Sequence, residues 1–478
     1  MAEKLLTRVD GLLSAVVTDR DGVVLLRANA PNCSPPFTES ALGCTFALAS
    51  DQASKLGLKK NKSIVSVYGS YQLVQFNHSS LITTFVANSN ANTDIRTFTT
   101  TFQFSAIHLM SNFSYTTGFP IFCVGFTRDD DVVLAGGGGI SKSGVKNKIA
   151  IYKVETAGKT LKPVVERELS RDEDAPMSIS VHPTESALAF GINSATNKVE
   201  AGENENCRIF QYSEERIEPV HNKGTLASRN SDDYQKVTRF NKDGSVLATG
   251  GTDGVIALLN YPSLTPVMAI TQFKGHEILD IDFSADGAHI AAVSAMNLWI
   301  ISAETGRVLE VITNPVLNKK KPFVFRTCRF GRGTFSNILY TVVNGDRNQK
   351  PFVCMWDATK WTRIRTLTVG PKPITTCTIS PDGKLIAFSS SDMGLRICSS
   401  KSLQVLMTVS NVHTLPVTSL AFNSDSSLLV SGSVDGTCRV VSVPKTFPKN
   451  NNFVMLIMAL LFLFLAGFVH VYQNNLIA

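Results

Sequence analysis

The sequence predicts three structural parts: a small α/β module, an all-β propeller of seven blades, and one C-terminal transmembrane helix. Three observations support this prediction. A unit of about 40 residues recurs from Phe119 to Val443, a wholly apolar stretch follows it, and the first 93 residues contain neither feature. The predicted boundaries are 1–93 for the module, 94–117 for an irregular junction, 118–446 for the propeller, 453–472 for the helix and 473–478 for a short tail.

Composition limits the class of protein. Hydrophobic residues make up 44% of the 478 residues and charged residues 18%, which excludes a disordered chain. The net charge of +7 is small for this length, so we expect no nucleic-acid partner. The nine cysteines are scattered and form no Cys-x-x-Cys pair. We therefore expect reduced thiols in the cytosol and no zinc site.

The N-terminal module is predicted from strands that alternate with a helix. Leu12–Ala28 reads as two strands joined by an Asp-Arg-Asp-Gly turn. Thr45–Leu58 has a helical pattern, and Lys62–Asn88 supplies two or three further strands. Asp19 and Asp21 are turn residues in this interpretation and do not form a site.

The recurring unit is a propeller blade. Each copy contains an apolar strand, a turn with Asp or Gly, an alternating strand, a Gly/Ser patch and a third strand. Copies begin at Phe126, Val181, Phe240, Phe283, Phe330, Ile379 and Phe422. This period, with Asp-Gly turns and no long helices, is typical of WD-repeat β-propellers. Gly275-His276 and Trp356-Asp357 fit the repeat's Gly-His and Trp-Asp positions, and we expect His276 to make a structural hydrogen bond to an Asp.

The C-terminal stretch Phe453–Tyr472 predicts a membrane span. It contains no Asp, Glu, Lys or Arg, and its length matches the roughly 20 residues that cross a bilayer. Lys445 and Lys449 precede the stretch, and nothing basic follows it. The positive-inside rule then predicts that everything before Phe453 is cytosolic and that the tail is lumenal.

The candidate functional site is the glycine-rich stretch AGGGGISKSGVKN, Ala135–Asn147. It is not a P-loop, because Gly144 is followed by Val145 and then by a strand. It is not a dinucleotide fingerprint, because Ser141 stands at the last glycine position and no helix follows. A plain hairpin loop and a functional loop both remain open. We find no nucleophile, metal cluster or acid–base pair, so we do not expect an enzyme that makes or breaks bonds.

Residues from about Gly118 to Ala478 resemble the WD-repeat exchange factors for Sar-type small GTPases in the endoplasmic-reticulum membrane. The resemblance rests on the glycine run in the first of seven blades and on the C-terminal apolar stretch. It implies guanine-nucleotide exchange on a Sar-type GTPase, the start of COPII vesicle formation, and ER-to-Golgi transport. The partners it implies are that GTPase, the ER membrane and, indirectly, the COPII coat.

The same resemblance implies roles for individual loop residues. It implies no required cofactor, but a potassium ion held by backbone carbonyls of the loop. Asn147 is the implied exchange residue. The other implied contact or cation-loop residues are Gly136, Gly137, Gly138, Gly139, Ser141, Lys142, Gly144 and Lys146. Two readings of Lys142, Lys146 and Lys148 stay open: they steer an acidic partner, or they are solvated loop charges.

Residues 1–93 resemble roadblock/longin-type modules, and most closely the MAP-kinase scaffold subunit of the lysosomal Ragulator complex. The matching stretches are VVTDRDGVVLL, TFALASDQASKLGLKKNKSI and YQLVQFN. The resemblance implies a roadblock-fold partner. It also implies an alternative function, as a scaffold adaptor for MAP-kinase and TOR signalling at the lysosomal or late endosomal surface.

The second resemblance stops at Thr93, so the module lacks the long C-terminal helix that closes the family's fold and is truncated in this sense. The stretch 94–117 has neither helical periodicity nor a linker composition. Two explanations are open. The two halves are a natural fusion, or they are adjacent genes joined in a chimeric gene model.

Overall fold

The computed structural model describes residues 11–19, 24–30, 46, 63–78, 81–89, 112–140, 144–314, 323–345 and 349–447. The chain divides into two compact units. One comprises Met1–Ile107 together with Pro444–Ala478, and the other comprises His108–Val443.

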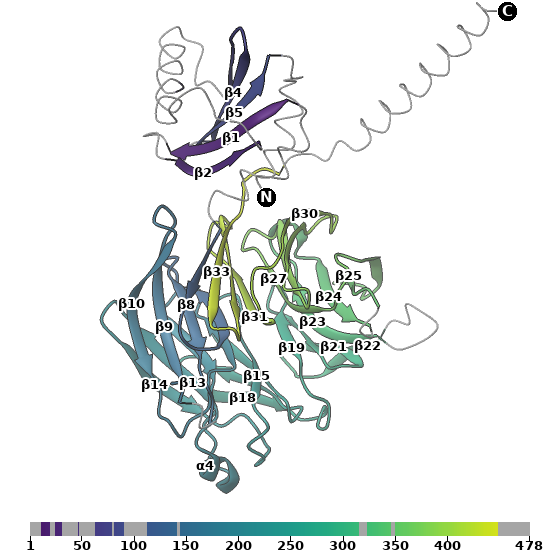
Figure 1. Cartoon of the computed structure of the whole chain (residues 1–478). Coiled ribbons are helices and arrows are strands. Elements are labelled where there is room, and N and C mark those ends of the chain that lie inside the picture. Colours follow the sequence, from purple (N-terminus) through teal and green to yellow (C-terminus); the bar gives the residue numbers. More distant parts are fainter. Residues whose placement is uncertain are drawn as a thin grey trace, which may run out of the picture. The chain divides into compact units, whose positions relative to one another are not determined.

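The first unit contains one five-stranded antiparallel sheet in the order β2-β1-β5-β4-β3 (Figure 1). Its strands are β1 (Leu12–Asp19), β2 (Val24–Asn29), β3 (Ser63–Val67), β4 (Tyr71–His78) and β5 (Leu81–Asn88). The strands expected from Leu12–Ala28 and Lys62–Asn88 are therefore present. Val74 and Phe85, on adjacent strands, are completely buried. The predicted helix Thr45–Leu58 lies outside the described residues except for Phe46.

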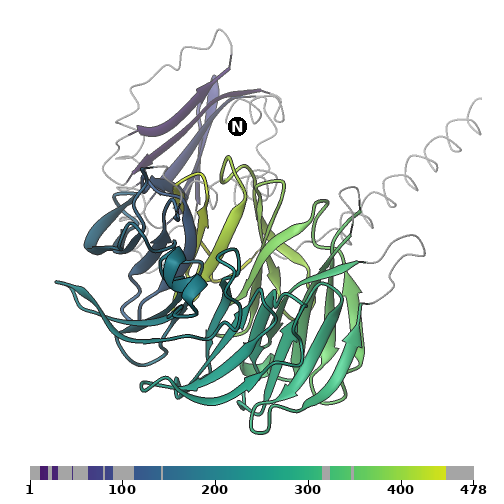
Figure 2. The ribbon, with the colours of Figure 1, turned by 90° about the horizontal axis from the view of Figure 1, so that it is seen from below.

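The second unit is a propeller of seven four-stranded antiparallel sheets, which confirms the predicted all-β propeller. Figure 2 shows the sheets fanned around an axis, with the short helix α4 (Thr196–Ala201) standing out from the face nearest the viewer. The seven innermost strands lie against one another around this axis. They are β7 (Ile121–Phe126), β11 (Ser178–Val181), β15 (Gln235–Phe240), β19 (Asp280–Phe283), β23 (Val324–Phe330), β27 (Ile374–Ile379) and β31 (Val417–Phe422).

The remaining strands follow outward in chain order in each blade. They are β8 (Val132–Gly136), β9 (Lys148–Glu155), β10 (Thr160–Glu168), β12 (Ala187–Gly191), β13 (Cys207–Tyr212), β14 (Ile217–Lys223), β16 (Val246–Gly251), β17 (Ile256–Asn260), β18 (Thr265–Ile270), β20 (His289–Val293), β21 (Asn297–Ser302), β22 (Val308–Thr313), β24 (Ile338–Asn344), β25 (Phe352–Asp357), β26 (Arg363–Leu367), β28 (Leu385–Ser390), β29 (Leu395–Ser399), β30 (Val405–Val409), β32 (Leu428–Ser433) and β33 (Thr437–Ser442). Their apolar residues pack between neighbouring blades, as Phe325 and Leu339 of one blade do against Leu298 of the previous one.

The ring is closed by a strand that the sequence analysis placed in the irregular junction. β6 (Phe113–Thr116) pairs with β33 and forms the outer strand of the seventh blade. Thr117 continues this closure, since its hydroxyl donates to the Gly436 carbonyl at 2.9 Å. The expectation of an irregular segment was wrong for residues 113–116, because their strand partner lies more than 300 residues later in the chain. Residues 94–111 lie outside the described part.

Of the two WD-repeat positions, the Trp of the Trp-Asp pair has a structural role, whereas the His of the Gly-His pair does not. Trp356 is buried and its indole N–H donates to the Thr341 hydroxyl at 2.8 Å, as a structural residue would. The expectation for His276 was wrong: its exposed ring makes no hydrogen bond to the described residues and lies beside Trp299. His413 is the structural histidine instead, with ring nitrogens 2.7 Å from the Thr437 hydroxyl and 2.8 Å from the Ser431 hydroxyl.

The seven cysteines within the described residues are free and buried, so they act as small apolar residues of the blades. Burial raises the pKa of their thiols, for example to about 12 in Cys207 and Cys398. Over the described ranges, no helix has the length and apolar character needed to cross a membrane. The predicted span Phe453–Tyr472 and the tail 473–478 lie outside those ranges.

Candidate functional site

The glycine-rich loop connects β8 to β9 in the first blade. Its first glycine is required by close backbone contact. A Cβ atom at Gly136 would lie 1.9 Å from the carbonyl oxygen of Pro120, and the next amide, of Gly137, donates to that same oxygen at 2.9 Å. The loop therefore leaves β8 pressed against the connection that enters the blade.

Asn147, the implied exchange residue, lies at the base of the loop with only 4% of its surface exposed. Its side-chain oxygen accepts from the Gly139 amide at 2.9 Å. Its side-chain nitrogen donates to the Glu173 carbonyl at 2.8 Å and to the Gly139 carbonyl at 3.3 Å. One amide group thus ties the loop to itself and to the connection between the first two blades. In this position, Asn147 holds the loop in shape and presents almost no surface to a partner.

Two further glycines explain why the run tolerates no side chain here. Gly137 has φ +144°, and a Cβ atom there would lie 2.3 Å from the Asn147 side-chain oxygen. Gly139 has φ +66°, and a Cβ atom there would lie 2.8 Å from a carboxylate oxygen of Asp174. Gly144 also has a positive φ, +78°, but it faces open space. The glycines at 137 and 139 therefore serve packing as well as backbone conformation.

Asp174 is a site residue that sequence reasoning missed. Burial raises the pKa of its carboxyl, against the opposing effect of the Ala175 and Ile140 amides. Within the described residues, no Lys, Arg or His forms an ion pair with it. The residue comes from the stretch Ser170–Pro176, where several acids stand together and nothing in the pattern distinguishes this one. Only the fold brings it against Gly139.

The lysines of the loop region are paired locally. The Lys146 ammonium lies 2.7 Å from the Glu168 carboxylate, and that of Lys148 lies 3.0 Å from Glu166. Both partners are on β10, the neighbouring strand, so these charges are largely balanced within the blade. Ser141 and Lys142 lie outside the described residues.

A hollow of about 740 Å³ lies between the loop and Ala195–Asn197, the N-cap and first two residues of α4. Gly139, Ile140 and Asn147 line one side of it. The ion pair of Glu173 with Arg208, at 2.6 Å, holds the connection behind the loop. No cluster of three or more His, Cys, Asp or Glu exists within the described ranges to hold a metal ion. The oxygens near the loop are instead carbonyl, amide and carboxylate oxygens, which suit a hard cation.

Comparison with known proteins relates the two units to two different groups. The family described as "Mitogen-activated protein kinase kinase 1 interacting" matches residues 1–96, and the WD domain, G-beta repeat matches residues 361–399 and 403–442. One chain in the crystal structure of the mitotic checkpoint complex shares the fold, with a TM-score of 0.53 and 15% identity over 69% of this chain and 93% of that one.

Two relatives show the same division. The guanine nucleotide-exchange factor SEC12 of Candida glabrata is 26% identical over 354 residues, covering 71% of this chain and 73% of the relative. The Ragulator complex protein LAMTOR3-A of Xenopus laevis is 51% identical over 92 residues, covering 19% of this chain and 75% of the relative. The N-terminal part of the chain therefore belongs to the LAMTOR3 family of Ragulator proteins, and most of the chain is homologous to the SEC12 exchange factors.

Proposed function

We propose that the propeller is a guanine-nucleotide exchange factor for a Sar-type small GTPase, anchored in the ER membrane through residues 453–472 and acting at the start of COPII vesicle formation. The homology to SEC12 supports the exchange activity. The observation that carries the assignment to this loop is the buried Asn147, which holds a glycine-rich turn in one conformation through three hydrogen bonds.

The loop acts by binding, without making or breaking a covalent bond. A loop already held in shape loses little conformational entropy when it docks against the GTPase, so more of its contact energy favours the complex. The complex accelerates release because it is more stable with the nucleotide-free GTPase than with the nucleotide-bound one. Asn147 is a positioning residue in this mechanism, and the exposed Ile140 is the described loop side chain best placed to touch the partner.

A potassium ion fits the same loop. The carboxylate of Asp174 is partly buried next to Gly139 and has no cationic partner within the described residues. The carbonyl oxygens of the glycine run can turn toward a cation without side-chain hindrance. A bound monovalent cation would supply charge balance for Asp174 and a fixed centre for those carbonyls. We expect Asp174 and the carbonyls of the glycine run to hold it.

The exchange proposal is tested by release of fluorescent GDP from a Sar-type GTPase. The full chain in detergent should accelerate release by at least about tenfold over the GTPase alone. Asn147→Ala should lose most of this acceleration, whereas Asn222→Ala, which removes an exposed asparagine on β14 that bonds Glu205, should keep it. If the wild-type chain does not accelerate release, the function is wrong; if Asn147→Ala matches the wild type, the role of the loop is wrong.

A second function is supported by the N-terminal unit. Because this unit belongs to the LAMTOR3 family, it is a candidate scaffold that pairs with a roadblock-fold partner at the lysosomal surface. The sequence similarity ends near residue 96, before the family's closing helix. We therefore predict weak pairing. Co-purification of the full chain with a roadblock partner at micromolar affinity or better would contradict that expectation and favour the scaffold.

Whether both functions reside in one protein depends on residues 94–112. Mass spectrometry of endogenous membranes should look for peptides that span this segment. A spanning peptide would establish a natural fusion. Peptides from the two flanks only, in two smaller proteins, would establish a chimeric gene model. Because β6 is part of the propeller, residues 113–117 belong with the SEC12-like protein in either case.

A further inference from the structure

The central channel of the propeller ends in a cavity of about 600 Å³ where the seven innermost strands end. This volume lies within the range of small-molecule sites in proteins. The final residues of those strands line it in a ring: Phe126, Val181, Phe240, Phe283, Phe330, Ile379 and Phe422. Innermost strands and their neighbours are antiparallel, so the loop that follows β8 emerges at the opposite end of the blades. The cavity is therefore separate from the glycine-rich loop.

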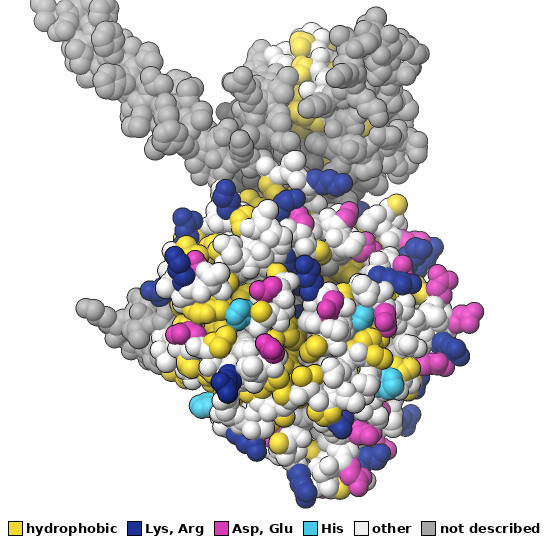
Figure 3. All heavy atoms as spheres, turned by 180° about the vertical axis from the view of Figure 1, so that it is seen from behind, with side chains coloured by type: hydrophobic (Ala, Val, Ile, Leu, Met, Phe, Trp, Pro, Cys, Tyr) yellow, Lys and Arg dark blue, Asp and Glu magenta, His cyan; other side chains and the backbone are white. Residues whose placement is uncertain are grey.

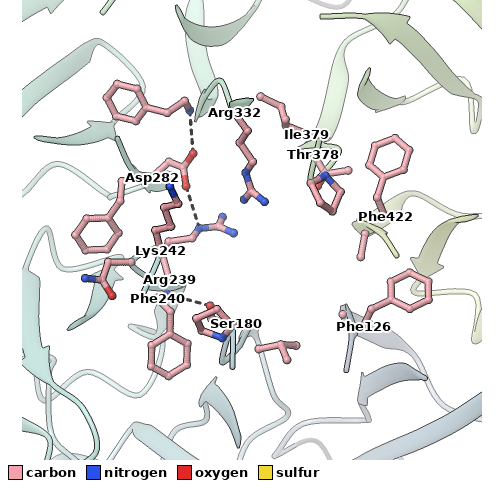
Figure 4. Close-up of a pocket in the computed structure, with 18 of the residues that line it drawn as sticks. Phe126, Ser180, Arg239, Phe240, Lys242, Asp282, Arg332, Thr378, Ile379 and Phe422 are labelled. Atoms are coloured by element: carbon pink, nitrogen blue, oxygen red, sulfur yellow. Dashed lines mark hydrogen bonds and ion pairs between the residues drawn. The ribbon is translucent and has the colours of Figure 1, made fainter. Parts of the chain in front are cut away.

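The cavity has two unlike walls. Figure 4 shows Arg239, Lys242 and Arg332 along one side, whereas Phe126 and Phe422 lie along the other. The basic residues come from the third and fifth blades, and the two phenylalanines come from the first and seventh. Apolar strand ends such as Phe240 also lie on the basic side, so the two sides differ in charge more than in apolar character. An occupant that carries both negative charge and apolar surface suits this lining.

The positive charge on the basic wall exceeds the negative charge of the carboxylates beside it. Asp282 lies 3.6 Å from Arg239 and also accepts the Phe330 amide at 2.8 Å. The next carboxylate inward, Asp280, is paired with Arg329 and lies 3.7 Å from Arg239. These two carboxylates are therefore already used by two arginines and the backbone.

Lys242 and Arg332 remain without an ion pair within the described ranges. Burial lowers the pKa of Arg239, and so do the charges of Arg329 and Arg332, against the opposing effect of Asp282 and Asp280. On the face shown in Figure 3, acidic and basic side chains are interspersed.

The geometry points to a binding site for an organic phosphate: a phosphate ester whose charged group contacts Arg332, Lys242 and Arg239 and whose apolar or aromatic part lies against Phe126 and Phe422. Guanidinium groups match phosphate oxygens with paired donors, and a doubly charged phosphate would balance Lys242 and Arg332. A carboxylate carries half that charge. The phosphate ester could come from a soluble metabolite or from a lipid headgroup.

The test uses the full chain in detergent and isothermal titration calorimetry with four probes. Adenosine diphosphate represents a soluble organic phosphate, dihexanoyl phosphatidic acid a lipid, pyrophosphate the charge alone, and hexaglutamate an acidic peptide. We expect at least one of the first two probes to bind about tenfold more tightly than pyrophosphate. Whichever of them binds more tightly identifies the source of the ligand.

Two variants connect binding to the site. Arg332→Gln combined with Lys242→Gln should weaken the tighter probe by about tenfold or more. Lys384→Gln removes the same kind of charge from the same face, at a residue that does not itself line the cavity, and should bind as the wild type does. Arg332→Lys keeps the charge but loses the paired donors, so its affinity should fall between those of the wild type and the double variant.

Thermal melting separates binding from folding. The double variant should melt no lower than the wild type, because it removes repulsion between cations. A lower melting temperature would show that the basic residues support the fold, and would overturn the proposal. Failure of both organic phosphates to bind, binding of hexaglutamate alone, or equal affinity in the double variant and in Lys384→Gln would overturn it as well.

Discussion

Two glycines of the same loop provide a sharp test of how the loop is held. Gly137→Ala and Gly144→Ala make the same chemical change at two positions with positive φ. At Gly144 the new Cβ atom meets nothing within 4 Å. At Gly137 it would lie 2.3 Å from the side-chain oxygen and 2.5 Å from the Cα atom of Asn147. Backbone must move in only one of the two variants.

The structure sets the size of the difference. A left-handed alanine costs about 1–2 kcal/mol, and this is the whole expected cost at Gly144. Gly137→Ala adds an overpacking cost of roughly 1–3 kcal/mol. It also displaces Asn147 and so removes at least one of its hydrogen bonds, worth about 1 kcal/mol. We therefore expect Gly137→Ala to destabilise the loop by about 2–4 kcal/mol more than Gly144→Ala does.

Native-state hydrogen exchange at the Gly139 amide measures this difference directly, because that amide donates to Asn147. If opening the loop costs 2–4 kcal/mol less in Gly137→Ala than in Gly144→Ala, exchange at this amide should be roughly 30-fold faster or more. Amides of β17, in the third blade, should be unaffected in both variants. If the two variants exchange equally fast at Gly139, the contact between Gly137 and Asn147 does not hold the loop, and the positioning role assigned to Asn147 is wrong.

Three other predictions concern the propeller as a whole. Burial raises the pKa of Asp392, but hydrogen bonds from Arg396 and Ser390 outweigh it and lower the pKa from 3.8 to about 2. The ionised carboxylate therefore stabilises the folded state fully above about pH 4, and this stabilisation is lost as the pH falls toward 2. Asp392→Asn should therefore cost about 2 kcal/mol at neutral pH and almost nothing near pH 2, measured by denaturant unfolding at both values; an equal loss at both would contradict this. Phe113→Ala should lower the free energy of unfolding by about 3 kcal/mol, because it removes a buried side chain of β6. Ser114→Ala, which loses one exposed hydrogen bond to Arg439, should change it by less than about 0.5 kcal/mol. Similar small effects in both variants would show that β6 does not close the ring. The seven buried thiols should resist iodoacetamide in the folded protein and react on denaturation, and rapid native labelling of any one of them would show that its blade opens.

The number and order of blades could be read from the sequence because each blade is a local unit. Its strands, Asp-Gly turns and small-residue patch lie within about 40 residues, and the pattern repeats, so each copy supports the others. The glycine run could likewise be identified as unusual without coordinates, since glycines cluster where backbones approach closely. The relation of residues 1–93 to a different family also needed only the sequence.

Contacts between residues that are far apart in the sequence could be identified only from the tertiary structure. The sequence of β6 looked irregular because its partner strand, β33, lies at the other end of the propeller's sequence. His276 and His413 could not be told apart by their neighbours, since the deciding partners, Ser431 and Thr437, follow His413 only after a further strand.

The candidate site shows the same division. The sequence alone determined that a glycine-rich loop stands in the first blade and that Asn147 ends it. Only the tertiary structure decided that Asn147 is buried, that Asp174 stands beside Gly139, and that Arg239, Lys242 and Arg332 share one cavity. The reason is physical: strand and turn preferences act over a few residues, whereas burial, ion pairing and shared cavities depend on which blades the closed ring brings together.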